Sequence, residues 1–296
     1  MNAIKTGLLM MLMGGLLLVV GALIGGPQGL IFALIFAVAM NFFAFWFSDK
    51  MALRIAGAHQ ATPEEAPELH SIVDEQVTRA GIPKPKVYII NKDSPNAFAT
   101  GRSPKKATIA ATTGIIKILN RDELGGVIAH ELAHVGNRDT LIMTMVATVA
   151  SAIGMIAWMA KFSLIFGGFG RGRGGGGLYG GAIGIGGLLL LAIVIPMLTT
   201  LVRLAISRTR EYQADATGAK TSGNPEALAS GLEKLDSWSK RIPMEANQAV
   251  AHLYIVEPMH GQTMSFLNGK GMMRLFSTHP PVEERVKRLR SMNQGW

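Results

Sequence analysis

The sequence predicts a mainly α-helical membrane protein with a small β-sheet, in which a four-helix transmembrane region accompanies a polar domain. Hydrophobic residues make up 49% of the 296 residues and charged residues only 17%, whereas globular domains average about 25% charged. Each of four apolar segments has close to the ~20 residues that cross a bilayer as a helix. These segments cover residues 6–24, 30–47, 140–160 and 182–202. The polar stretches 48–139 and 203–296 remain to form the domain.

The first two apolar segments indicate a hairpin anchor over residues 1–47. The stretch 25–29, which contains Pro27 and three glycines, separates them and is typical of a tight turn. Lys5 and the first segment would also suit a cleaved signal peptide. A second apolar segment begins almost at once, however, and this favours the anchor.

The last two apolar segments occupy residues 140–202 and are joined by a glycine-rich loop. Basic residues follow both pairs of segments, for example Lys50 and Arg210, and place the polar domain on the cytoplasmic side. Arg171 and Arg173 in the loop disagree with this rule, because they would lie outside. We expect the two segments to span the membrane despite this conflict.

The net charge of +9 is not concentrated in a basic block. No basic cluster alternates with aromatic residues as nucleic-acid-binding surfaces require, so we expect no nucleic-acid partner. Lys and Arg beside the apolar segments are better explained by anionic lipid and topology. The chain has no cysteine, which excludes disulfides and thiolate ligands and leaves His, Asp and Glu to bind any metal.

The polar stretches show patterns of both helices and strands. A helix is expected at 64–80, with Thr62 as its N-cap and Pro63 at its first position. Short β-branched and alanine-rich runs predict strands, and apolar periodicity predicts further helices. The expected strands cover 87–90, 97–99 and 107–112, with a turn at 101–106. The expected helices cover 122–136, 203–221, 225–239 and 281–292.

His130, Glu131 and His134 lie in the helix expected at 122–136. Residues four apart share a face of a helix, so both imidazoles can reach one zinc ion. Glu131 lies about 100° further around the helix and can act as general base on a water that zinc has activated. An ordinary amphipathic helix with surface His and Glu is the alternative. The apolar residues around the motif indicate burial, however, and buried histidines need partners.

A catalytic zinc held by two histidines needs a third protein ligand. Glu211 and Asp215 are four apart in a second expected helix and share a face. Glu211 can bind the metal, while Asp215 can accept a hydrogen bond from the free ring nitrogen of a ligating histidine. Alone, these carboxylates would suit a solvated helix, since Arg208 and Arg210 could pair with them. Together with the first motif they favour a metal site.

Four pieces of the sequence resemble HtpX-type membrane zinc metalloproteases, in the family that also contains the CaaX prenyl endopeptidases. They are His130-Glu131-Leu132-Ala133-His134, Arg210-Glu211-Tyr212-Gln213-Ala214-Asp215, Pro95-Asn96-Ala97-Phe98-Ala99-Thr100-Gly101 and Ser277-Thr278-His279-Pro280-Pro281. The order of the apolar segments also matches, with two before the zinc helix and two after it. The resemblance implies a zincin-like (gluzincin) domain divided between residues 48–139 and 203–296.

The resemblance implies one Zn²⁺ per subunit, held by His130, His134 and Glu211, with Glu131 as general base. It also implies that His279 faces the cleft and stabilises the oxyanion. The sequence around His279 fits a helix-entry turn before Pro280 and Pro281 as well.

The resemblance further implies a site for the substrate. Asn96, Ala97, Phe98 and Ala99 would lie on an edge strand to which an extended peptide adds as another strand.

The implied activity is hydrolysis of peptide bonds in misfolded or damaged membrane proteins. The implied location is the bacterial inner membrane, with several membrane passes and a cytoplasmic active site. A membrane zinc hydrolase with a non-peptide substrate is the main alternative. A metal-holding transporter would need polar residues inside its membrane segments, whereas Asn41 is the only strongly polar side chain well within the first two. A pseudo-protease is disfavoured because Glu131 is present.

Overall fold

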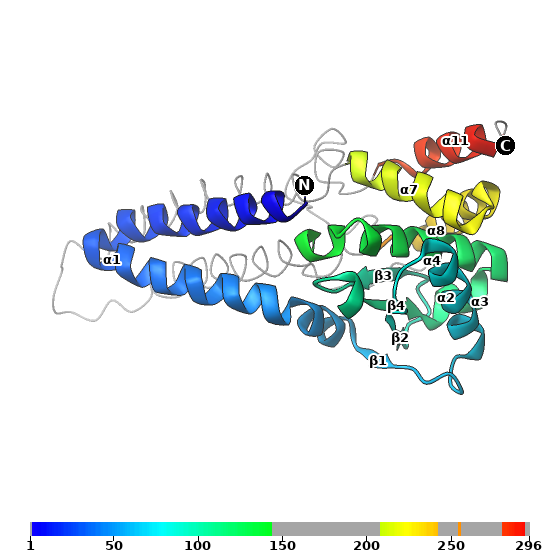
Figure 1. The fold of residues 1–296 in the computed structure, drawn as a ribbon, viewed down its shortest axis with the longest axis horizontal. Helices are drawn as coiled ribbons and strands as arrows, with labels where there is room; N and C mark the ends of the chain where they lie inside the picture. The colour runs from blue at the N-terminus through cyan, green and yellow to red at the C-terminus, as the bar shows by residue number, and fades with distance from the viewer. Residues whose placement is uncertain (1, 144–207, 242–253, 256–279, 294–296) are drawn as a thin grey trace.

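Helix α1 forms the N-terminal end of the structure, a computed structural model that describes residues 2–143, 208–241, 254–255 and 280–293 (Figure 1). It spans Asn2–Ala56 and consists of two helices that meet at Gly26, whose φ of 56° and ψ of −142° are not helical. Pro27 follows directly, at the start of the second helix, where the missing N–H of proline is tolerated. The two helices run alongside each other as a hairpin (Figure 1), and the break lies within the turn expected at 25–29.

The second helix of α1, Gly26–Ala56, is the one described helix that is long and apolar enough to cross a membrane, judged by length and composition. Its most apolar window has a mean hydropathy of 2.3, and only 17% of that window is buried. Phe32 is 74% exposed and Ile35 63% exposed. Exposed apolar surfaces of this extent mark contact with a membrane or another protein. The helix continues to Ala56, past the apolar segment that ends at 47.

Four strands form a mixed sheet in the order β1-β2-β4-β3. They are β1 (Ala58–Gln60), β2 (Lys86–Ile90), β3 (Ala97–Thr100) and β4 (Thr108–Thr112). β1 pairs antiparallel with β2, β2 parallel with β4, and β3 antiparallel with β4. β3 is therefore an edge strand of this sheet.

The two faces of the sheet contact different parts of the chain, because alternate side chains of a strand point to opposite faces. Ala97 and Ala99 of β3 belong to the main core, which the helices of the domain complete. Phe98 belongs to a smaller cluster with Leu53, near the end of α1. The small side chains of Ala97 and Ala99 allow α4 to approach this strand.

Helix α2 spans Pro67–Ala80, so the expected start at 64 with Thr62 as N-cap is wrong. Pro67 occupies the first turn, and Ala66 is the N-cap residue without a side-chain hydrogen bond. The residue before a proline avoids the helical conformation, so a helix cannot run from Pro63 through Pro67. Thr62 instead closes a separate turn, in which its carbonyl accepts the N–H of Glu65 at 3.1 Å.

Helix α4, Arg121–Gly136, begins with a capping box. The side chain of Asn120 accepts the N–H of Glu123 at 2.9 Å, and the carboxylate of Glu123 accepts the N–H of Asn120 at 3.0 Å. Such reciprocal bonds satisfy free N–H groups in the first turn. Residues from Glu123 to Val135 are all buried, so α4 is the central helix of the core.

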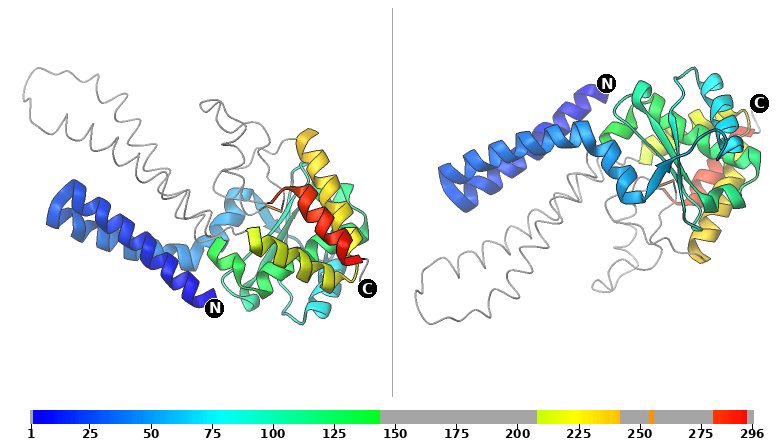
Figure 2. Two further views of the ribbon diagram at one scale, coloured as in Figure 1. Left: turned by 90° about the horizontal axis from the view of Figure 1, so that it is seen from above. Right: turned by 90° about the horizontal axis from the view of Figure 1, so that it is seen from below.

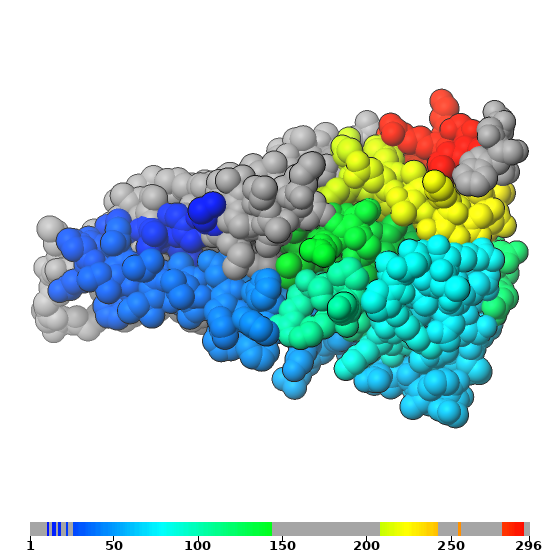
Figure 3. Space-filling model, viewed as in Figure 1, coloured from blue at the N-terminus to red at the C-terminus, as the bar shows by residue number. Residues whose placement is uncertain are grey.

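Three helices from the second polar stretch complete the domain. They are α7 (Arg208–Ser222), α8 (Pro225–Arg241) and α11 (Val282–Asn293). α7 and α8 pack directly on α4, and α11 packs on both of them. Figure 2 shows α1 extending from one end of this arrangement and α11 at the opposite end. The blue surface of α1 projects from the rest of the described chain in Figure 3.

Most expected elements of the domain are confirmed to within about two residues, which is the usual uncertainty of an element's end. β1 and α3 (Thr113–Ile118) are additional elements too short to give a periodic signal. The apolar segment at 182–202, nearly all of that at 140–160, residues 203–207 and His279 lie outside the described residues. The four-helix transmembrane region therefore stays a prediction.

The backbone of α7 lies unusually close to that of α4. A Cβ atom at Gly218 would lie 2.8 Å from both the Cα and the N of His130, whereas carbon atoms pack at about 3.5–4.0 Å. Glu211, Asp215 and Gly218 follow the spacing i, i+4 and i+7, so they share one face of α7. Glycine at position 218 thus brings the two carboxylates of α7 to the histidine face of α4.

We predict that Gly218→Ala lowers the melting temperature of the purified full chain, because the new methyl group forces the two helices apart. Overpacking of this kind costs about 1–3 kcal/mol. Gly136→Ala is the matched control, since a Cβ there would meet nothing within 4 Å. Equal melting temperatures for Gly218→Ala and the parent would show that the close approach is not needed.

Candidate metal centre

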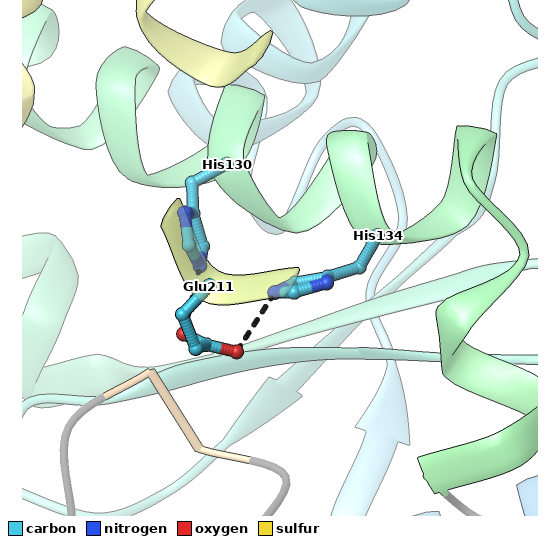
Figure 4. A group of neighbouring side chains, drawn as sticks. All are labelled: His130, His134 and Glu211. Carbon is cyan, nitrogen blue, oxygen red and sulfur yellow. Dashed lines mark ion pairs between the residues drawn. The ribbon is translucent and has the colours of Figure 1, made fainter. Parts of the chain in front are cut away.

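His130, His134 and Glu211 converge between α4 and α7. Figure 4 shows both imidazoles pointing toward the carboxylate of Glu211. One donor atom from each of the three lies within 4.8 Å of the others, and all three residues are buried. The two rings are nearly perpendicular, with centroids 4.8 Å apart. Two helices far apart in the sequence thus present three donors to one point.

The spacing of these donors fits a divalent metal such as zinc. Two ligand atoms bound tetrahedrally at ~2.1 Å lie about 3.4 Å apart. Nε2 of His134 lies 3.4 Å from Oε1 of Glu211, and Nε2 of His130 lies 3.8 Å from Oε2 of Glu211. These distances exceed those of ordinary hydrogen bonds. The donor set, two imidazoles and one carboxylate, is a usual one for catalytic zinc.

Asp215 and Arg285 fix the orientation of the His130 ring. Oδ1 of Asp215 lies 3.0 Å from Nδ1 of His130, which directs Nε2 toward Glu211. Arg285, on α11, donates to both oxygens of Asp215 at 2.6 and 2.8 Å. Burial raises the pKa of Asp215, but Arg285 outweighs it and lowers that pKa to about 2. Burial lowers the pKa of His130 to about 4, so its ring is neutral and can bind a metal.

Asp139 plays the corresponding part for His134 at a longer distance. Its Oδ2 lies 3.5 Å from Nδ1 of His134, and Arg138, with a φ of 60°, turns the chain back after α4. Burial lowers the pKa of His134, but Asp139 and Glu211 outweigh it and raise that pKa to about 10. The site thus attracts positive charge, and a metal ion would compete with this proton.

Glu131 lies between the donors and the edge of the sheet. Its Oε2 accepts the backbone N–H of Ala99 at 2.8 Å, and the residue is only 3% exposed. A carboxylate held in this way beside two imidazoles is placed to accept a proton from a water molecule.

The edge of β3 that faces away from β4 is hydrogen-bonded to other parts of this chain. The carbonyl of Asn96 accepts the N–H of Thr112, so in the alternating ladder the polar groups of Ala97 and Ala99 point away from β4. The carbonyl of Ala97 accepts the N–H of Ile255 at 3.1 Å, and Ala99 donates to Glu131. The carbonyl of Ile255 in turn accepts a hydrogen bond from the guanidinium of Arg285 at 3.3 Å.

A small cavity adjoins Glu131 and the two histidines. Its volume is about 10 Å³, and Ala99 and Ile255 form part of its wall. A cavity needs about 10–15 Å³ to hold one water molecule. The described arrangement therefore has room for a single water beside Glu131 and none for a peptide.

The structure brings together five of the residues expected at the site, namely His130, Glu131, His134, Glu211 and Asp215. Asn96 to Ala99 lie on an edge strand beside them, and His279 lies outside the described residues. Sequence reasoning missed Asp139 and Arg285. Asp139 could have been noticed as a carboxylate just after the motif helix, whereas nothing local distinguishes Arg285 from the other arginines of α11.

Known proteins are similar in sequence to this chain over nearly its whole length. The family model described as peptidase family M48 matches residues 63–293. A protease HtpX homolog of Desulfatibacillum aliphaticivorans is 51% identical over 288 residues, which cover 97% of this chain and 89% of that relative. A protease HtpX homolog of Pyrococcus furiosus is 49% identical over 290 residues, which cover 98% of this chain and 95% of that relative.

A solved structure shares the fold. The crystal structure of S. mikatae Ste24p matches with a TM-score of 0.51 and 18% sequence identity. The match covers 88% of this chain and 57% of Ste24p. At this identity the likeness concerns the fold alone.

We predict that Asp139→Asn weakens zinc binding by about 10- to 100-fold, the usual effect of losing a carboxylate that orients a ligating histidine. Competition with a chelator of known affinity measures this change. Asp122→Asn is the matched control, because Asp122 is an exposed carboxylate in the first turn of the same helix. Parent-like zinc affinity in Asp139→Asn would remove Asp139 from the metal centre.

Proposed function

The chain belongs to peptidase family M48 and is a metalloprotease, and from this premise we propose that it is a membrane-embedded zinc endopeptidase. His130, His134 and Glu211 would hold one zinc ion, and Glu131 would act as general base. The observation that carries the proposal is the convergence of the three donors beside Glu131 and the edge of β3. This convergence supports the proposal, because the groups that peptide hydrolysis would need lie close together.

Zinc, when bound, supplies a Lewis acid that polarises the scissile carbonyl and makes a water molecule more acidic. Glu131 takes a proton from the attacking water and then delivers it to the leaving amine. The N–H of Ala99 holds the carboxylate of Glu131 at 2.8 Å and so keeps it beside the small cavity. The single water that fits this cavity would be the nucleophile.

A carboxylate behind each histidine positions that ligand for this chemistry. Asp215 accepts Nδ1–H of His130 and is itself held by two bonds from Arg285. Asp139 faces Nδ1 of His134. Each histidine thereby keeps Nε2 directed at the metal position, which is the usual role of a carboxylate behind a ligating imidazole.

The substrate would be an extended peptide that adds to the edge of β3. Asn96, Ala97, Phe98 and Ala99 would form its binding strand, and the carbonyls of Ala97 and Ala99 would accept main-chain hydrogen bonds from the peptide. A peptide in this position replaces the bond from Ile255 to Ala97 and widens the cavity. Phe98 points to the opposite face, where its ring lies 5.2 Å from that of Tyr254, and supports the strand from behind.

His279 is the proposed donor to the oxyanion. This role follows from the resemblance of the Ser277 to Pro281 motif to HtpX-type proteases, and the residue lies outside the described part of the chain. In the sequence, His279 stands three positions before Val282, where α11 begins, and α11 carries Arg285 to the site.

The exposed apolar surface of α1 supports a membrane location. We propose that four membrane segments, at 6–24, 30–47, 140–160 and 182–202, anchor the domain formed by residues 48–139 and 203–296. Basic residues after each pair, such as Lys50 and Arg210, favour a cytoplasmic active site at the bacterial inner membrane. An endopeptidase in this position would act on misfolded or damaged membrane proteins, which expose extended segments at the bilayer surface.

We predict that Glu131→Gln lowers cleavage of an unfolded protein by at least about 100-fold, since it removes the general base, and that zinc stays bound. The measurement uses detergent-purified chain, stripped of metal and given one equivalent of zinc. Glu68→Gln, at an exposed carboxylate of α2, is the control and should cleave like the parent.

Parent-like cleavage by Glu131→Gln would contradict the assigned base. A parent chain that binds zinc but cleaves no peptide would instead favour a hydrolase with a non-peptide substrate.

We predict that methylation of single backbone amides in a peptide substrate raises KM with a period of two residues. Only alternate amides of an added strand point toward β3, and each lost hydrogen bond weakens binding by about 5- to 10-fold. A series of otherwise identical peptides, each methylated at one amide, measures the pattern. A KM that does not alternate along the peptide would refute strand addition at this edge.

A further inference from the structure

The turn between β3 and β4, residues 101–107, carries three basic residues and no acidic one. They are Arg102, Lys105 and Lys106. The short helix η1, Pro104–Lys106, leaves both lysines exposed. Within the described residues, no carboxylate forms an ion pair with any of the three.

Exposed basic residues elsewhere in the domain are more often paired. Carboxylates lie within ion-pair distance of them, as in Lys84 with Asp74 at 2.7 Å, Lys117 with Asp93 at 3.1 Å and Arg290 with Glu226 at 3.0 Å. The turn is therefore a concentrated positive surface that the described part of the domain does not neutralise.

Trp46 connects this turn to the apolar helix of α1. The guanidinium carbon of Arg102 lies 4.2 Å from the centroid of the Trp46 ring, a cation–π contact. Trp46 is 44% exposed and precedes Asp49, the first charged residue after Pro27. Tryptophan is enriched where membrane helices leave the hydrocarbon region. The contact thus sets the turn at the level of lipid headgroups when α1 crosses a bilayer.

The turn is also fixed to the active-site elements. Thr140 donates its hydroxyl to the carbonyl of Gly101 at 2.9 Å. A side chain at Gly101, whose φ is 134°, would collide with the main chain of Lys106, so the turn is folded tightly on itself. Because β3 ends at Thr100, directly before the turn, a displacement of the turn would also move the strand beside Glu131.

We propose that residues 101–107 bind the headgroups of anionic phospholipids, with Lys105 and Lys106 on the phosphate groups and Arg102 held on Trp46. The inference rests on the membrane location of α1 given under Proposed function. Anionic leaflets attract basic side chains within about one Debye length of the surface. Bound headgroups hold β3 against the bilayer surface, where it meets peptide segments that emerge from the membrane.

The test uses the full chain reconstituted in bilayers, with Trp46 as its sole tryptophan. Trp158→Phe, Trp238→Phe and Trp296→Phe provide this parent. Phosphatidylglycerol and phosphatidylcholine, brominated on the acyl chain near the headgroup, are compared as quenchers of Trp46 fluorescence at equal mole fractions. Stronger quenching by phosphatidylglycerol is the expected result and should weaken as salt is added.

Lys105→Gln/Lys106→Gln should lower this preference by about an order of magnitude at low salt. Lys220→Gln/Lys287→Gln is the matched control, because both lysines are exposed, lie on α7 and α11, and have no ion pair among the described residues. The control should keep the parent preference. Peptide cleavage in detergent should be unchanged in both variants, which shows that they are folded.

Equal quenching by the two lipids in the parent would overturn the headgroup site, as would a preference that survives in Lys105→Gln/Lys106→Gln. Quenching by neither lipid would mean that α1 does not enter the bilayer. That result would overturn the membrane location as well as the headgroup site. Failure of the headgroup site alone is thus distinguishable from failure of the membrane location.

Discussion

The close approach of α7 to α4 at Gly218 is the constraint on which the metal centre depends. The backbones meet where any side chain would collide with His130. Asp215 and Glu211 lie on the same face of α7 as Gly218, about one and two turns away from it. The close approach therefore brings both carboxylates to the histidines of α4. The site is thus a property of a helix–helix contact, and each helix alone would present only solvated polar residues.

This contact buries several charged groups together, which is tolerated only because each has a partner. An isolated buried charge costs several kcal/mol. Asp215 is matched by Arg285, whereas His134 faces both Asp139 and Glu211. The asymmetry gives one neutral and one protonated histidine, with pKa values of about 4 and about 10. A divalent ion would replace the proton on His134 and balance the charge of Glu211, so the same geometry would serve both the fold and the proposed reaction.

Much of this arrangement is predictable from the sequence, because helical spacing is local. His130 and His134, like Glu211 and Asp215, are four apart, and that spacing fixes their shared faces. Asp139 and Arg285 escaped prediction because their roles depend on a non-helical turn at Arg138 and on the packing of α11. The start of α2 was misplaced because the constraint from Pro67 outweighs the capping signal of Thr62. The bond from Ile255 to Ala97 depends on long-range pairing that no periodicity reveals.

The coordination of zinc by residues of both helices is the central claim, and X-ray absorption at the zinc edge tests it most directly. The full chain loaded with one equivalent of zinc should show two imidazoles and one carboxylate, with bond lengths of about 2.0–2.2 Å. Glu211→Gln should alter the oxygen contribution and leave both imidazoles in place. A zinc spectrum without imidazole scattering, or one that Glu211→Gln leaves unchanged, would contradict a site shared by α4 and α7.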